Sequence, residues 1–310
     1  MPLFGPRRNL PIDTHVRINR DSLQAFGLCQ WYPGLHPHGA GGGLVKEYVA
    51  GFKNANMNGN RSYPDAPHVT NPFGAATQFA APFFNGSSVT MTGLTYSGGS
   101  ASGPQNGPQP FPIAPPFSVA IWVRPWTQNG VIWWHGRQAV GTWYAHYIGY
   151  SNASKSCSAN SVDNNVFRSA SSASNALLDQ KWNHVCAVWH STTDRRIYVN
   201  GVFHAQDTNT SNPDLSSGSL IMVGAANANA SVDNYWKGHI FDLRMYRRAL
   251  SAPEVMAIYN PLTRFDLYST DRYSEPYPGL GATFDPTSVV GTMTSAPPQF
   301  DRQFVPVPYF

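Results

Sequence analysis

A strict alternation of side chains over residues 117–124 constrains the fold more than any other feature of the sequence. The residues that would share one face are all apolar: Phe117, Val119, Ile121 and Val123. A period of two is that of a β-strand, whose successive side chains point to opposite faces. Further short strand-like runs follow at 130–135, 143–150, 183–190, 195–200, 219–223 and 236–246.

Turn signals separate these runs, and helix signals are scarce. Asn200-Gly201 stands between two apolar runs and predicts a tight hairpin, because a type I′ turn needs two positive φ angles. Helix-start chemistry occurs at Ser251 with Glu254, which predicts one short helix over 252–259. Only 12% of residues are charged, about half the usual share, so turns and neutral loops dominate. This pattern predicts an all-β, antiparallel sandwich.

Composition divides the chain into three parts. Residues 1–20 are Pro-rich and predict an N-terminal arm, and residues 21–262 supply the strands of the sandwich. Residues 263–310 are rich in Pro and aromatic residues but have no periodicity, so they predict an extended C-terminal arm. The apolar end of this arm predicts docking on a partner or on the chain's own sandwich, through Phe300, Phe304, Val307, Tyr309 and Phe310.

Three segments together resemble the laminin-G-like, concanavalin A-like lectin family. They are Phe-Ser-Val-Ala-Ile-Trp-Val-Arg-Pro at 117–125, the pair 181–189 and 196–201, and the run 236–251 that ends in Arg-Ala-Leu-Ser. Their order and spacing also match the family, and the resemblance spans roughly residues 20–262. It implies a jelly-roll sandwich with one short helix.

Some enzymes of the family that the chain resembles cleave polysaccharides, using two carboxylates on one strand or on facing strands. Glycoside hydrolysis needs one carboxyl as acid and another as base or nucleophile. The chain has three glutamates, Glu47, Glu254 and Glu275, and none belongs to such a strand motif. We therefore expect a protein that is not an enzyme. A divergent polysaccharide-cleaving enzyme is the least favoured of three hypotheses, and the other two are given at the end of this subsection.

Calcium is the usual ion of the family that the chain resembles, although the chain departs from the family's pattern. Phe241 stands where many relatives carry an acidic residue, and Asp242 follows it. We expect no cofactor other than a possible calcium ion, with Asp233 and Asp242 as its candidate ligands. Three cysteines without CxxC spacing argue against a disulfide framework and against a zinc site.

A cluster of aromatic residues between positions 126 and 150 predicts sugar binding. Exposed aromatic faces stack on sugar rings, and the candidates are Trp126, Trp133, Trp134, Trp143 and Tyr144. The alternative is that about half of this cluster fills the core or an interface through strand alternation.

Charge and hydropathy limit the classes of partner that the sequence favours. The net charge is +4, but the basic residues are scattered, so we expect no nucleic-acid partner. No apolar run approaches the ~20 residues of a membrane span, and residues 1–8 do not read as a secretory signal. A lectin-like sandwich without an export signal fits a virus or phage structural protein, assembled in the host cytoplasm and displayed on the virion surface.

Under this first hypothesis the chain is a non-catalytic capsid decoration or adhesion protein. Its partners would be capsid or other particle proteins, or copies of itself, together with cell-surface glycans. The alternative is an extracellular carbohydrate-binding module or bacterial surface adhesin.

Overall fold

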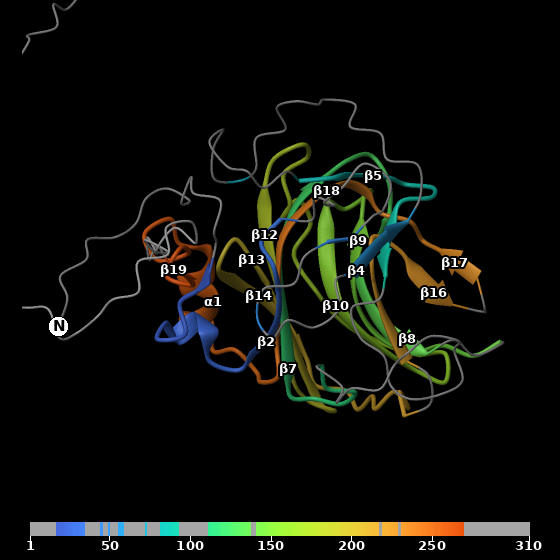
Figure 1. The fold of residues 1–310 in the computed structure, drawn as a ribbon. Coiled ribbons are helices and arrows are strands. Elements are labelled where there is room, and N and C mark those ends of the chain that lie inside the picture. Colours follow the sequence, from blue (N-terminus) through green and yellow to red (C-terminus); the bar gives the residue numbers. More distant parts are fainter. Residues whose placement is uncertain are drawn as a thin grey trace, which may run out of the picture. The chain divides into compact units, whose positions relative to one another are not determined.

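A computed structural model describes residues 17–34, 44–45, 49, 55–58, 72, 81–92, 111–137, 141–216, 219–228 and 231–269. The chain divides into two units, 1–270 and 271–310, and the second lies outside the described residues. The predicted docking residues Phe300, Phe304, Val307, Tyr309 and Phe310 therefore lie outside them too. The first unit is an antiparallel β-sandwich with one α-helix, which confirms the predicted fold class (Figure 1).

One sheet has seven strands and contains the alternating segment at its centre. Its order is β14 (Val202–Asp207), β13 (Asp194–Val199), β12 (Asn183–Ser191), β7 (Phe117–Pro125), β18 (Lys237–Tyr246) and β2 (Leu28–Tyr32), with β5 (Phe83–Asn85) also paired to β18. The Asn200-Gly201 turn that joins β13 to β14 has φ angles of 50° and 78°, as the sequence predicts.

The second sheet has eight strands. Its order is β11 (Val166–Ser171), β10 (Ser156–Asp163), β9 (Tyr144–Ser151), β8 (Gly130–Arg137), β15 (Ser219–Val223), β6 (Thr90–Thr92), β4 (Ala55–Asn58) and β3 (Leu44–Val45). Beside it lies a hairpin of β16 (Ala226–Ala228) and β17 (Ser231–Asp233). The sequence pattern does not predict β10 and β11, because their Ser- and Asn-rich composition is typical of loops.

The core lies between the two sheets. Phe117, Val119, Ile121 and Val123 are fully buried there, as the alternation predicts. Trp133 of β8 and Trp189 of β12 meet across the core with ring centroids 5.8 Å apart. The inward faces of both sheets are therefore closed by large apolar side chains.

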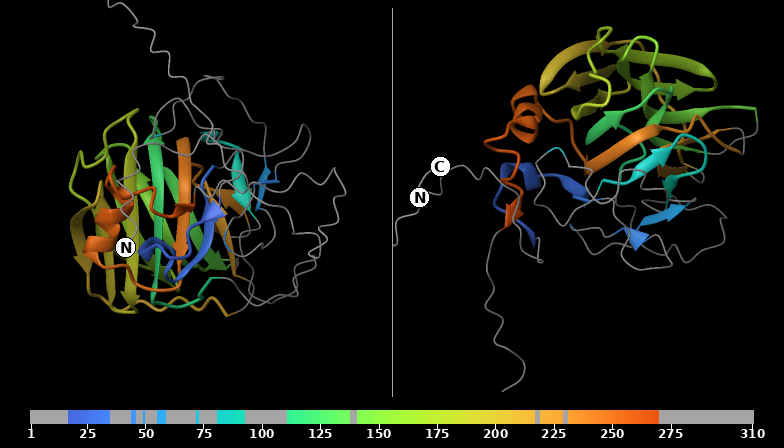
Figure 2. Two further views of the ribbon diagram at one scale, coloured as in Figure 1. Left: turned by 60° about the vertical axis from the view of Figure 1, so that its left-hand side comes forward. Right: turned by 90° about the horizontal axis from the view of Figure 1, so that it is seen from above.

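The outer face of the seven-stranded sheet is covered as well. Helix α1 (Ala252–Tyr259) spans the residues that the sequence predicts, and its start is fixed by a capping box between Ser251 and Glu254. Val255 and Ile258 of the helix are buried in a second apolar cluster that includes Trp122 of β7. Figure 2 shows the helix on one outer side of the sandwich. No helix among the described residues has the length and apolarity that a membrane crossing requires.

Two chain segments that are far apart in sequence meet beside this helix. β1 (Arg17–Ile18) pairs antiparallel with β19 (Tyr268–Ser269), and a short 3-10 helix, η1 (Leu23–Ala25), follows β1. Phe265, Leu267 and Tyr268 are buried in the cluster under the helix. Residues 263–269, which the sequence assigns to the C-terminal arm, are therefore packed on the sandwich.

A buried ionic network fixes this arrangement. Asp242 has a φ of 47° at a β-bulge of β18, and Arg244 binds both of its oxygens, with Nη2 2.8 Å from Oδ2. The indole Nε1 of Trp31 donates to Asp242 Oδ1 at 2.8 Å. Arg244 Nη1 donates to Gln24 Oε1 at 2.6 Å, and Nη2 donates to the carbonyl of Arg264 at 3.1 Å. Burial alone would lower the pKa of Arg244, but the Asp242 carboxylate outweighs it, so the pKa is raised.

Removing the carboxylate of this network should destabilise the fold strongly. Asp242→Ala leaves the Arg244 guanidinium charged and buried without its counter-ion, which should lower the free energy of unfolding by about 3–5 kcal/mol. Asp214→Ala is the control, because Asp214 pairs with Arg137 at the surface and should cost below about 1 kcal/mol. Urea unfolding measures both, and equal losses in the two variants would contradict the assignment.

Candidate functional site

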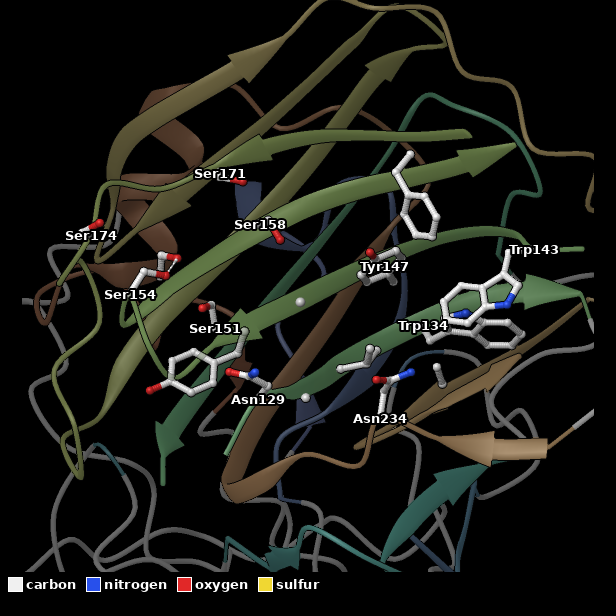
Figure 3. A pocket seen from close by; sticks show the side chains of 17 residues that line it. Asn129, Trp134, Trp143, Tyr147, Ser151, Ser154, Ser158, Ser171, Ser174 and Asn234 are labelled. Atoms are coloured by element: carbon white, nitrogen blue, oxygen red, sulfur yellow. Dashed lines mark hydrogen bonds between the residues drawn. The ribbon is translucent and has the colours of Figure 1, made fainter. Parts of the chain in front are cut away.

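The outer face of the eight-stranded sheet carries a pocket of about 630 Å³ over β8, β9, β10 and β11 (Figure 3). On β10 the lining residues Ser156 and Ser158 alternate with Cys157 and Ala159, which are buried in the core. The residues that line the pocket are Asn129, Gly130, Val131, Trp134, Trp143, Tyr147, Gly149, Tyr150, Ser151, Ser154, Ser156, Ser158, Phe167, Ser171, Ser174, Ala226 and Asn234.

One end of the pocket is aromatic. The ring centroids of Trp143 and Phe167 lie 5.8 Å apart, and Phe167 is 50% exposed. Tyr147 is half-buried and lies nearby on β9, while Trp134 forms the floor and is only 2% exposed. The backbone N–H of Trp143 donates to Asn165 Oδ1 at 2.8 Å, which holds Trp143 next to the turn between β10 and β11. Trp143 is half-buried and its ring is inclined at 56° to that of Phe167, so the two rings form a partly exposed, angled apolar platform.

The other end is rich in hydroxyl groups. Six serines line the pocket, and Figure 3 shows Ser151, Ser154 and Ser174 at the end away from the tryptophans. The hydroxyls of Ser154 and Ser156 lie 2.6 Å apart. The amide Nδ2 of Asn160 donates to the hydroxyl of Ser158 at 2.8 Å, so this hydroxyl is held in place. Hydroxyl groups can both donate and accept hydrogen bonds, so this end can bind hydroxyl-bearing ligands.

The pocket stays neutral over the ordinary pH range. Burial raises the pKa of Tyr147 to about 12. The pKa of Tyr150 is also raised, first by burial and then by the Asp179 carboxylate, which accepts a hydrogen bond from the Tyr150 hydroxyl at 3.2 Å. Asp179 itself pairs with Lys155 at 2.7 Å. Both phenols are therefore protonated at neutral pH.

The structure brings together two of the five predicted sugar-contacting residues, Trp134 and Trp143. The prediction for Trp133 is corrected: its side chain is fully buried between the sheets, because neighbours on a strand face opposite ways. Trp126 lies after β7, with its ring 5.7 Å from that of Phe83. Tyr144 is half-buried beneath the Arg137 guanidinium, 4.0 Å from its ring centroid, and does not line the pocket.

Sequence reasoning missed Phe167 and all six serines. Ser151 ends β9, and the others lie on β10, β11 and their flanking turns, where the Ser- and Asn-rich composition is typical of loops. One signal was present: Asn164-Asn165 has φ angles of 49° and 65°, as a type I′ hairpin turn requires. Asn tolerates positive φ nearly as well as Gly, so this dipeptide marks the hairpin.

The two predicted calcium ligands do not share a site. Asp233 lies on β17 of the small hairpin, whereas Asp242 lies on β18 of the seven-stranded sheet. Asp242 is 1% exposed, and both of its oxygens are occupied by Arg244 and Trp31. Among the described residues, no group of three or more His, Cys, Asp or Glu side chains is placed to hold a metal ion.

The candidate acid–base groups lie away from the pocket. Glu254 binds the start of α1 and pairs with Arg248 at 2.7 Å; burial opposes its charge, but these partners lower its pKa to about 2. Glu47 and Glu275 lie outside the described residues. His135 is buried between the sheets, 3.3 Å from the Ser219 hydroxyl, and burial lowers its pKa to about 3. Neither Glu254 nor His135 lines the pocket.

Substitution of one core tryptophan and one pocket tryptophan should change stability by different amounts. Trp133→Ala removes a ring from the interior and should lower the free energy of unfolding by about 3–5 kcal/mol. Trp143→Ala removes a surface ring but keeps the backbone contact with Asn165, so it should change stability by less than about 1 kcal/mol. Chemical denaturation of both variants tests this, and a reversed order would contradict the placement of the two rings.

Comparison with solved structures finds relatives of low sequence identity. Domain 4 of the extracellular arabinanase AbnA of Geobacillus stearothermophilus, solved with arabinotriose, is 18% identical over 75% of this chain and 98% of that chain (TM-score 0.49). The carbohydrate-binding domain CBM40 of the Ruminococcus gnavus sialidase, bound to α2,3-sialyllactose, is 15% identical over 47% and 84% (TM-score 0.43). The binding domain of botulinum neurotoxin serotype D is 12% identical over 75% and 51% (TM-score 0.49).

The family follows from the sequence rather than from these structural similarities. No curated protein sequence matches the chain. A sequence model of the concanavalin A-like lectin/glucanase superfamily matches residues 98–256, which is just over half of the chain. The matched segment contains the central strand β7, all the strands of the pocket and most of α1. The chain therefore belongs to the concanavalin A-like lectin/glucanase superfamily.

Proposed function

We propose that the sandwich is a non-catalytic carbohydrate-binding domain and that its ligand lies in the pocket on the outer face of the eight-stranded sheet. The observation that carries the proposal is the combination of a partly exposed aromatic platform, Trp143 with Phe167, at one end of the pocket and a serine-rich opposite end. Membership of a superfamily of lectins and glucanases supports it.

The chemistry of the pocket suits a sugar. A sugar ring has an apolar face of C–H groups that packs on an aromatic ring, and an edge of hydroxyls that exchange hydrogen bonds. Trp143 and Phe167 offer the first kind of contact, and Ser158 and Ser171 the second. Sites with an apolar lining and a few placed polar groups are typical of small-ligand binding.

The same pocket lacks the groups that glycoside hydrolysis needs. The reaction uses two carboxyl groups on either side of the scissile bond. No residue that lines the pocket in the described part of the chain is an Asp or a Glu. We therefore propose binding without cleavage.

A glycan array with the full-length protein tests the proposal, followed by calorimetry with the best oligosaccharide. Trp143→Ala should weaken binding at least about tenfold, because loss of a central aromatic contact costs more than about 1.4 kcal/mol. Phe203→Ala is the matched control: Phe203 is a 49% exposed ring on β14 of the other sheet, and its loss should leave affinity unchanged. A blank array, or equal losses in both variants, would contradict the proposal.

A second proposal concerns where the domain works. We propose that it is displayed on the surface of a virus or phage particle, assembled in the host cytoplasm and attached to capsid proteins or to copies of itself. The Pro- and aromatic-rich composition of residues 271–310 favours this, since such a segment cannot build a core of its own but can bury apolar side chains on a partner. An extracellular adhesin with the same pocket is the alternative.

Truncation after Thr270 tests whether the segment 271–310 attaches the protein to a particle. It removes Phe300 and Phe310 but keeps Tyr268, which is buried in the sandwich. The truncated protein should no longer co-sediment with purified particles of the encoding virus, while its glycan affinity stays unchanged. The double variant Phe304→Asp/Phe310→Asp repeats the test in the full chain. Particle binding that survives both changes would contradict attachment through this segment.

A further inference from the structure

In the part of the chain that the structure describes, the lining of the pocket carries no charged residue. Of the 17 described lining residues, six are serines, and none is Asp, Glu, Lys, Arg or His. Among these residues only the phenols of Tyr147 and Tyr150 can ionise, and they stay protonated because burial raises the pKa of both. For a chain with 21 basic residues, this is a distinctive local environment.

The basic side chain of Lys155, at the margin of the pocket, is paired with a carboxylate. Lys155 lies between the lining residues Ser154 and Ser156, and its Nζ is 2.7 Å from Asp179 Oδ2. The same Nζ donates to Asn152 Oδ1 at 2.6 Å. The Asp179 carboxylate offsets the charge of Lys155, so this pair adds no net positive charge at the margin of the pocket.

The free-energy balance therefore differs between neutral and anionic sugars. A neutral sugar hydroxyl exchanges water for serine or amide partners of similar strength. A carboxylate or a sulfate loses much stronger hydration, and recovering it takes charge-assisted hydrogen bonds from Arg or Lys. The described lining of the pocket offers neither, so an anionic group entering it would lose solvation without compensation.

The extent of the pocket favours a chain of sugars over a single terminal unit. Its lining residues on β9 run from Tyr147 to Ser151, roughly 13 Å at 3.3 Å per residue, and Trp143 extends the pocket beyond the start of this strand. The aromatic platform is at one end, and Ser151, Ser154 and Ser174 are at the other (Figure 3). A single sugar ring cannot contact both ends, whereas an oligosaccharide can.

We infer that the pocket selects neutral oligosaccharides and discriminates against chains that carry a carboxylate or a sulfate. This inference rests on the proposed function, since it specifies the ligand class of the same pocket. It separates the chain from any sialic-acid- or uronate-binding role.

Matched glycan pairs test the inference with the full-length protein. Each pair is a neutral oligosaccharide and the same chain carrying one sulfate ester, sialic acid or uronic acid, and affinities are measured by calorimetry at low salt. The neutral member of the best-bound pair should bind at least about tenfold more tightly than its anionic counterpart. Its affinity should not change between about pH 5 and pH 9, because no lining residue titrates in that range.

A charge-insertion variant provides the second arm. Ser171 is exposed on β11 and lines the pocket, so Ser171→Arg should narrow or reverse the preference by supplying a guanidinium. Gln206→Arg is the matched control, since it adds the same charge at an exposed position of β14 in the other sheet. It should leave the preference unchanged.

The outcomes distinguish a failure of the neutral selectivity from a failure of carbohydrate binding itself. Tighter binding of the anionic members, or an equal shift in both arginine variants, overturns the neutral selectivity but leaves carbohydrate binding standing. Equal affinity for single sugars and for chains overturns the oligosaccharide assignment. Absence of binding to any glycan overturns the proposed function and the inference together.

Discussion

The buried ion pair between Asp242 and Arg244 is the interaction on which the rest of the architecture depends. It lies at the bulge of β18 and reaches Trp31 of β2, Gln24 of η1 and the carbonyl of Arg264 after α1. Segments from both ends of the described chain are thereby held over the seven-stranded sheet. With that face covered, the outer face of the eight-stranded sheet is the one left open over β8 to β11, and the pocket is there.

The fold was largely predictable because its strongest signals are local. The alternation over Phe117–Pro125 marked the central strand, and Ser251 with Glu254 marked the helix Ala252–Tyr259, since periodicity and capping depend on neighbouring residues alone. The hairpin of β10 and β11 was missed for the same reason. Its outward positions carry serines and its inward ones Cys157 and Ala159, so the contrast between its faces is small.

The site was only partly predictable, because it depends on which way each side chain points. Trp133 and Trp134 are adjacent in sequence, yet one fills the core and the other forms the pocket floor. A register shift between Val131 and Trp133 sets that parity, and no sequence pattern reveals it. Asp242 illustrates the same limit: its carboxylate reads as a metal ligand until Arg244, two residues away, is seen to occupy it.

The pairing of β1 with β19 brings the two ends of the described chain together. Arg17 and Ser269 are partners in one small sheet, and Tyr268 packs in the cluster on the helix-covered side. Chain continuing past either residue starts from a single point, on the side opposite the pocket. The outer faces of the two sheets thus have separate tasks in the architecture: one holds both ends of the described chain, and the other carries the pocket.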